Sequence, residues 1–75
     1  MINQSQHVEG FEKRLLKAIG DKDMSCNQVG HLIGIGQGRV SKWVNDGEMP
    51  SCYNLVKLAK LLEVSTDYLL GLEGE

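Results

Sequence analysis

The chain has 75 residues, enough for one domain and too few for two, because cores below roughly 70 to 80 residues are already marginal. Apolar residues make up 41% of the sequence and charged residues 24%, a globular rather than a disordered composition. The net charge of −2 argues against indiscriminate binding to nucleic acid, although residues 1–45 carry +2 and residues 46–75 carry −4, which permits a local cationic face.

The start of the chain and its two cysteines indicate where the protein acts. No apolar run approaches the ~20 residues of a membrane span, and the polar start MINQSQHVEG lacks the regions of a signal peptide. A cytoplasmic location is therefore expected. In that setting Cys26 and Cys52 are interpreted as two reduced thiols rather than a disulfide.

Helical rather than alternating spacing runs through every apolar segment. A first helix has a buried face at positions i, i+4, i+7 and i+8 and ends within residues 20–22. A second, short helix is capped by the Ser25 hydroxyl, which can accept from the free amides of the first turn. The side chains predicted to be buried in these two helices are Phe11, Leu15, Ala18 and Ile19, then Val29, Leu32 and Ile33.

Two glycines in the middle of the chain predict how the second and third helices are arranged. Gly30 lies within the second helix, where it costs about 1 kcal/mol relative to alanine, and a close approach of the third helix would explain it. Gly34 is predicted to end the second helix, because glycine takes positive φ without steric cost. The third helix is expected from Gln37 to Asn45, with Trp43 as its anchor in the core and with Val40 and Val44 as its other apolar positions.

Two further helices complete the chain. Ser51 caps the fourth, whose inward stripe leaves Lys57 and Lys60 outside. Ser65 or Thr66 caps the last, which ends at Gly71. The residues expected to be buried in them are Leu55, Leu58, Ala59, Leu62, Leu69 and Leu70. The predicted fold is therefore all-α and compact, with five helices over residues 9–71 between a tail at 1–8 and an acidic tail at 72–75.

The two tyrosines have two possible positions from the sequence. Half burial is favoured for both Tyr53 and Tyr68 over a place at a dimer seam.

The stretch GIGQGR, residues 34–39, contains three glycines that resemble a phosphate-binding loop. A nucleotide loop follows a buried strand, whereas the preceding NQVGHLI has helical spacing, and no Walker lysine pattern is present. Cys26, His31 and Cys52 lack zinc-site spacing, and no nucleophile with an oriented base is evident. The sequence therefore predicts no cofactor, no metal and no enzyme.

Two short helices joined by a glycine turn are the sequence form of a helix-turn-helix, whose second helix enters the DNA major groove. With MSCNQVGHLIGIGQGRVSKWVNDG, MPSCYNLVKLAKLLEVS and TDYLLG in this order, residues 9–71 resemble the phage-repressor and Cro class of helix-turn-helix domains, the xenobiotic-response-element family. The resemblance implies a prokaryotic or phage regulator of transcription, most often a repressor, that binds double-stranded operator DNA as a homodimer. It implies no membrane and no small-molecule ligand.

Carried over by position, the resemblance assigns two groups of site residues. The base-reading side chains are Gln37, Arg39 and Lys42, with Asn27 and Gln28 as lesser candidates. The phosphate-contacting residues are Ser25, Gly36, Gly38, Ser41 and Asn45. Glutamine pairs with adenine, and arginine or lysine with guanine, while serine and open backbone amides suit phosphate. Alternatives stay open: Gln37 as a polar first-turn residue, Arg39 and Lys42 on phosphate, and Ser25 as a cap alone.

Four residues depart from the family's pattern. Cys26 stands where a glutamine is usual, Ile19 where an arginine often grips phosphate, and Asp46 and Glu48 occupy a loop that is commonly basic. The expected affinity for DNA is therefore modest. An antitoxin-like or anti-regulator module that binds protein through the same scaffold is the alternative function.

Overall fold

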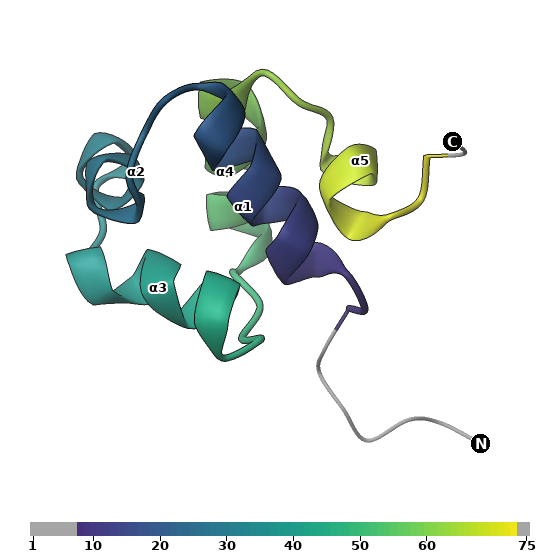
Figure 1. Ribbon diagram of the computed structural model, residues 1–75, viewed down its shortest axis with the longest axis horizontal. Helices are drawn as coiled ribbons and strands as arrows, with labels where there is room; N and C mark the ends of the chain where they lie inside the picture. The colour runs from purple at the N-terminus through teal and green to yellow at the C-terminus, as the bar shows by residue number, and fades with distance from the viewer. Residues whose placement is uncertain (1–7, 74–75) are drawn as a thin grey trace.

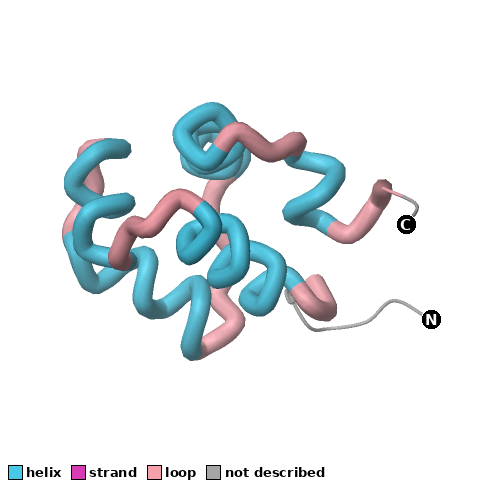
Figure 2. The backbone as a smooth tube through the Cα atoms, turned by 45° about the horizontal axis from the view of Figure 1, so that its top comes forward, coloured by secondary structure: helices cyan, strands magenta, loops and turns pink. Residues whose placement is uncertain are grey.

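The computed structural model describes residues 8–73, apart from the side chain of Gln37. Within this range the chain forms five helices and no strand, which confirms the predicted fold class (Figure 2). The helices are α1 (Phe11–Asp21), α2 (Cys26–Ile33), α3 (Gln37–Asn45), α4 (Cys52–Leu62) and α5 (Thr66–Leu70). Figure 1 shows α2 and α3 at one end of the molecule, α5 at the other, and α1 crossing in front of α4.

All five helices contribute to one apolar core. Trp43 is only 2% exposed and is the largest of the fully buried side chains, so it anchors α3 as predicted. Tyr68 and Leu55 are half-buried against this core, and Leu70 is half-buried as well, so Leu55 and Leu70 are less buried than predicted. The buried apolar residues are Phe11, Leu15, Ala18, Ile19, Val29, Ile33, Val40, Trp43, Leu58, Ala59, Leu62 and Leu69.

The predicted caps are confirmed at three helix starts and two helix ends. The hydroxyls of Ser25, Ser51 and Ser65 accept from backbone amides three residues later, at 3.1, 3.2 and 2.9 Å. Gly34 and Gly71 follow α2 and α5 with φ of 82° and 77°. Short polar and glycine signals therefore determine where these helices begin and end.

Leu32 is 58% exposed, so its predicted burial is wrong. At about 100° per residue, the buried arc of α2 can include either Leu32 or Gly30 beside Val29 and Ile33. Gly30 is the buried one. A helix can pack more closely on its glycine side, and α2 is turned that way, which leaves Leu32 on the surface.

Two residues of α4 also differ from their predicted positions. Tyr53 is 70% exposed instead of half-buried. Lys57 was expected on the outside but is half-buried, with its ammonium 4.5 Å from the centre of the Tyr53 ring. An aromatic face attracts a cation, so the ring covers the lysine head instead of entering the core.

One arginine connects the start of α1 to the end of α5. Arg14 Nε donates to Leu69 O at 3.0 Å, and Arg14 Nη2 donates to Glu9 O at 2.9 Å. A Cβ at Gly10 or Gly71 would lie within 2.5 or 2.7 Å of this guanidinium. The start of α1 and the end of α5 are thereby fixed at the end of the molecule away from α2 and α3 (Figure 1).

Candidate nucleic-acid interface

A three-residue turn, 34–36, joins α2 to α3. The Gly34 amide donates to His31 O at 3.2 Å, and the Ile35 amide donates to Gly30 O at 2.9 Å. Both bonds satisfy carbonyls that have no partner inside the helix. Ile35 is half-buried against the core. The turn is therefore held both by backbone hydrogen bonds and by the packing of a side chain. This fixes where α3 begins.

The two sides of α3 have different chemistry. Val40 and Trp43 are buried, whereas Arg39, Lys42 and Asn45 are exposed. Residues three positions apart are neighbours on a helix surface, so the guanidinium and ammonium groups share one region of α3. In Figure 1 this helix lies along an edge of the molecule. It is held by its apolar side and offers two cations and an amide from its open side.

Gln37 is the first residue of α3, but its side chain lies outside the described residues. Its assignment as a base reader stays a prediction. The backbone position is the one the sequence predicted, at the end of α3 that follows the turn.

The start of α3 is open to approach. Gly36 occupies the N-cap without a side-chain cap, and a Cβ at Gly36 or Gly38 would meet no atom within 4 Å. Both glycines are exposed. The first amides of a helix lack intrahelical partners and carry the positive end of the helix dipole. Neither glycine itself therefore places a side chain between this backbone and an approaching phosphate.

The start of α2 is closed by a reciprocal pair of hydrogen bonds. The Gln28 amide donates to Ser25 Oγ at 3.1 Å, and the Ser25 amide donates to Gln28 Oε1 at 2.8 Å. Bidentate pairing with adenine needs this same carboxamide oxygen, so Gln28 reads a base in that way only if the pair opens. Asn27 is exposed beside it.

Replacing Ser25 by alanine separates capping from phosphate contact. We expect S25A and S65A each to lose about 1 kcal/mol of stability, since each serine caps one helix. Only S25A is expected to weaken DNA binding, because Ser65 caps α5 at the other end of the molecule (Figure 1). Urea unfolding and DNA titration of both variants measure the two effects. Equal DNA affinities for S25A and S65A would leave Ser25 with capping alone.

The four departures from the family pattern fall into two kinds. Ile19 is 2% exposed, and half-buried Cys26 packs against the core, so neither position offers a group to DNA. Asp46 and Glu48 are exposed just after α3. Ser41, proposed to contact phosphate, is half-buried. The interface therefore relies on few cations and has carboxylates beside it.

Few cations imply a weak dependence of DNA affinity on salt. Each phosphate neutralised by lysine or arginine contributes about −0.9 to the slope of log K against log salt. Even if Arg39 and Lys42 contacted phosphate rather than bases in both copies of the predicted homodimer, the slope would reach only about −4, so a slope no steeper than this is expected. Titrations at several salt concentrations measure it. A slope near −10 would show that many other cations contact the DNA.

One comparison with known proteins decides the family. The family model described as "Helix-turn-helix" matches residues 13–69, which span α2, the turn and α3. The chain belongs to the Cro/C1-type helix-turn-helix family. No curated protein and no solved structure matches the sequence at a significant level.

Membership of this helix-turn-helix family indicates the general activity of the protein. The family consists of DNA-binding regulators that are not typically enzymes, and this chain is a DNA-binding transcription regulator of the helix-turn-helix type. In the helix-turn-helix arrangement the second helix lies in the major groove. The second helix of this unit is α3, and Arg39 and Lys42 are exposed on it. The family match and the chemistry of α3 therefore agree.

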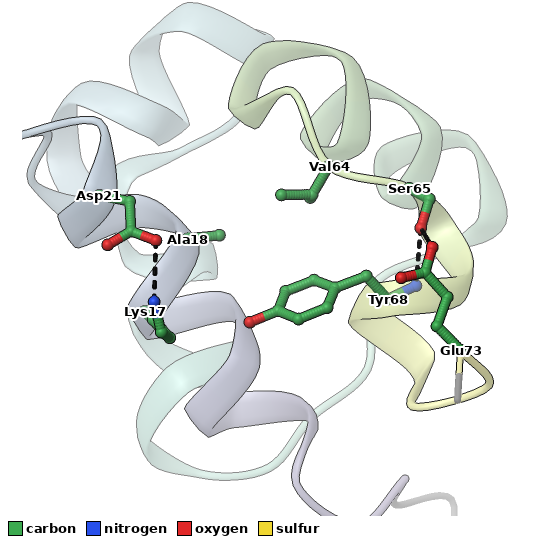
Figure 3. A pocket seen from close by; sticks show the side chains of 7 residues that line it. All are labelled: Lys17, Ala18, Asp21, Val64, Ser65, Tyr68 and Glu73. Atoms are coloured by element: carbon green, nitrogen blue, oxygen red, sulfur yellow. Dashed lines mark hydrogen bonds and ion pairs between the residues drawn. The ribbon is translucent and has the colours of Figure 1, made fainter. Parts of the chain in front are cut away.

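One hollow away from α2 and α3 offers no reactive arrangement. It has a volume of about 390 Å³ and lies between α1 and α5, with Tyr68 across it (Figure 3). Lys17 Nζ donates to Asp21 at 3.1 Å at one side, and Ser65 bonds Glu73 at the other. The hydrogen bond from Lys17 to Asp21, and then the charge of Asp21, raise the pKa of Lys17. The charged side chains of this hollow are thus each bonded to a neighbouring side chain.

Residues 8–73 contain neither a cluster of metal ligands nor a helix that could span a membrane. No group of three His, Cys, Asp or Glu side chains among residues 8–73 is placed to hold a metal ion. Cys26 and Cys52 are free thiols. No helix in the described part of the chain has the length and apolar character to cross a membrane.

Proposed function

We propose that the protein is a cytoplasmic, sequence-specific repressor of prokaryotic or phage type, and that it reads operator DNA with α3 in the major groove. The open side of α3 carries this proposal. Buried Trp43 and Val40 hold the helix, while exposed Arg39 and Lys42 project from it. A base reader must be held rigidly and its polar groups must be accessible, and α3 meets both requirements.

The proposed contacts divide between bases and phosphates. Arg39 and Lys42 pair with guanine O6 and N7, and Gln37 pairs with adenine, each pair giving roughly 1–3 kcal/mol of discrimination. Asn27 and Gln28 make secondary contacts from α2. The contacts that position the protein on the phosphates come from Ser25, Gly36, Gly38, Ser41 and Asn45. Gly36 and Gly38 act through their backbone amides, since a Cβ at either position would meet open space and the glycines add no side chain there.

The active form in this proposal is a homodimer. One small module with few cations gains affinity and specificity when a second copy reads the next half-site, about 34 Å away along the duplex. Light scattering of the protein alone and with its DNA measures the assembly. A single copy in both conditions would rule out the dimer.

A protein-binding role on the same scaffold has its own support. Leu32, Tyr53 and Val56 are 58, 70 and 44% exposed on α2 and α4, and the net charge is −2. Exposed apolar side chains and few cations suit an antitoxin-like or anti-regulator partner contact. This role makes no demand on Arg39 or Lys42.

Selection of duplexes from a random pool distinguishes the two roles. The wild-type protein is expected to enrich a defined motif, and the double variant R39A/K42A is expected to enrich none or a degenerate one. The fold of the variant is checked by circular dichroism, since both side chains are exposed and their loss leaves the core intact. Failure of the wild-type protein to enrich any motif would end the repressor proposal.

A further inference from the structure

Lys57 connects α4 to the last carbonyl of α2. Its ammonium donates to Ile33 O at 2.9 Å, although the two residues are 24 positions apart. Ile33 is the final residue of α2, so its carbonyl is one of those that a helix leaves without an internal partner. A lysine ammonium at this end also meets the negative pole of the helix dipole.

The position of the Lys57 ammonium is itself restricted. The side chain is half-buried, and its nitrogen lies 4.5 Å from the centre of the Tyr53 ring, one turn earlier in α4. The ring face attracts the cation and limits its rotamers. The ammonium is therefore held between an aromatic face and the Ile33 carbonyl.

The Ile33 carbonyl belongs to the peptide unit that enters the turn. The next residue, Gly34, has φ 82° and ψ 29°, and these angles set the direction in which the chain leaves α2. The turn's own amides satisfy the carbonyls of Gly30 and His31, but not that of Ile33. Lys57 supplies the hydrogen bond there, from a helix outside the helix-turn-helix unit.

We propose that Lys57 is a positioning residue for DNA reading: by holding the Ile33 carbonyl it fixes the angle at which the turn delivers α3. The proposal rests on the proposed function and deepens it. With nine residues, α3 is about 13 Å long, so a rotation of about 5° at the turn moves its far end by about 1 Å. Base contacts require placement within about 0.5 Å.

Two variants separate positioning from charge. K57M keeps the length and apolar stem of the side chain but removes the donor, and K60M removes the same charge three positions along α4, from an exposed lysine. Each is measured for affinity to the selected duplex and to a scrambled duplex, at several salt concentrations. All affinities are measured at a temperature below the one at which each variant begins to unfold. A loss of stability then does not change the measured affinity.

We expect K57M to reduce the ratio of selected to scrambled affinity by at least about 5-fold, the factor carried by one lost base contact, while K60M leaves the ratio within about 2-fold. The salt slope of K57M is expected to match that of the wild type, because Lys57 does not contact phosphate. K57R, which retains a donor and stacks on the ring, is expected to restore the ratio.

An unchanged ratio in K57M would overturn the proposal. A salt slope shallower by about 0.9 per copy would overturn it as well, because Lys57 would then be a phosphate contact. Failure of the repressor proposal looks different: the wild-type protein would then enrich no motif, and no ratio would be defined.

Discussion

Replacing Trp43 by alanine is expected to lower the free energy of unfolding by about 3–5 kcal/mol, the range measured for large aromatic side chains lost from a core. Trp43 is 2% exposed and is the largest fully buried residue. A domain of 75 residues has a total stability of about 4–11 kcal/mol, so W43A removes much of it. Urea unfolding followed by circular dichroism is the measurement, because the variant has no tryptophan to fluoresce.

The matched control is L32A. Leu32 is 58% exposed on α2, and its truncation is expected to cost about 0.5 kcal/mol or less. Comparable losses in W43A and L32A would contradict the orientation of α2, and a loss below about 1 kcal/mol in W43A would contradict the anchoring of α3.

The second large expected effect is a loss of DNA affinity when Arg39 and Lys42, on the exposed side of α3, are replaced. R39A/K42A removes two proposed base contacts of roughly 1–3 kcal/mol each from every copy, so affinity for the selected duplex should fall by about 30-fold to 10⁴-fold for each copy that binds. Affinity for scrambled duplex should fall much less, since only the phosphate attraction of two charges is lost. Fluorescence anisotropy with both duplexes gives the two values.

K17A/K60A is the control for charge. It removes two exposed lysines from α1 and α4 and leaves α3 unchanged. Its selected and scrambled affinities are expected to change by similar small factors. If K17A/K60A loses selectivity as R39A/K42A does, then overall charge and not α3 determines recognition.

Local signals predicted most of the fold. The bounds of α3, the serine caps and the ends of α2 and α5 at Gly34 and Gly71 follow from side chains and backbone preferences within a few residues. Such signals act over one helical turn. A single sequence therefore contains them in readable form.

Contacts between distant segments were not readable in this way. Lys57 and Ile33 are 24 positions apart, and the clamp from Arg14 to Leu69 spans 55. Another such contact is the hydrogen bond from Lys22 to Glu63, which lowers the pKa of the Glu63 carboxyl. The backbone of Glu63 also has a positive φ of 59°. The rotation of α2 toward Gly30 depends on its neighbours in space. Periodicity alone did not distinguish Gly30 from Leu32.

In the candidate site, too, some features were predicted from the sequence and others were found only in the structure. Residue types on α3 indicated the readers, and the structure shows Arg39 and Lys42 exposed, Gly36 and Gly38 unobstructed. Ser25 was predicted as a cap, but the reciprocal bond to the Gln28 oxygen was not. A serine followed three residues later by glutamine is the signature of such a capping box, so the signal that would have found this pair was present in the sequence.

Reading of base edges in the major groove by α3 is tested by changing one acceptor atom there. Each guanine of the selected duplex is replaced in turn by 7-deazaguanine, which lacks the N7 acceptor used by arginine. Wild-type affinity is expected to fall by about 5-fold or more at one guanine, while R39A shows no further loss at that guanine. Wild-type affinity that is insensitive at every guanine, or equal losses in wild type and in both R39A and K42A, would contradict major-groove reading by α3.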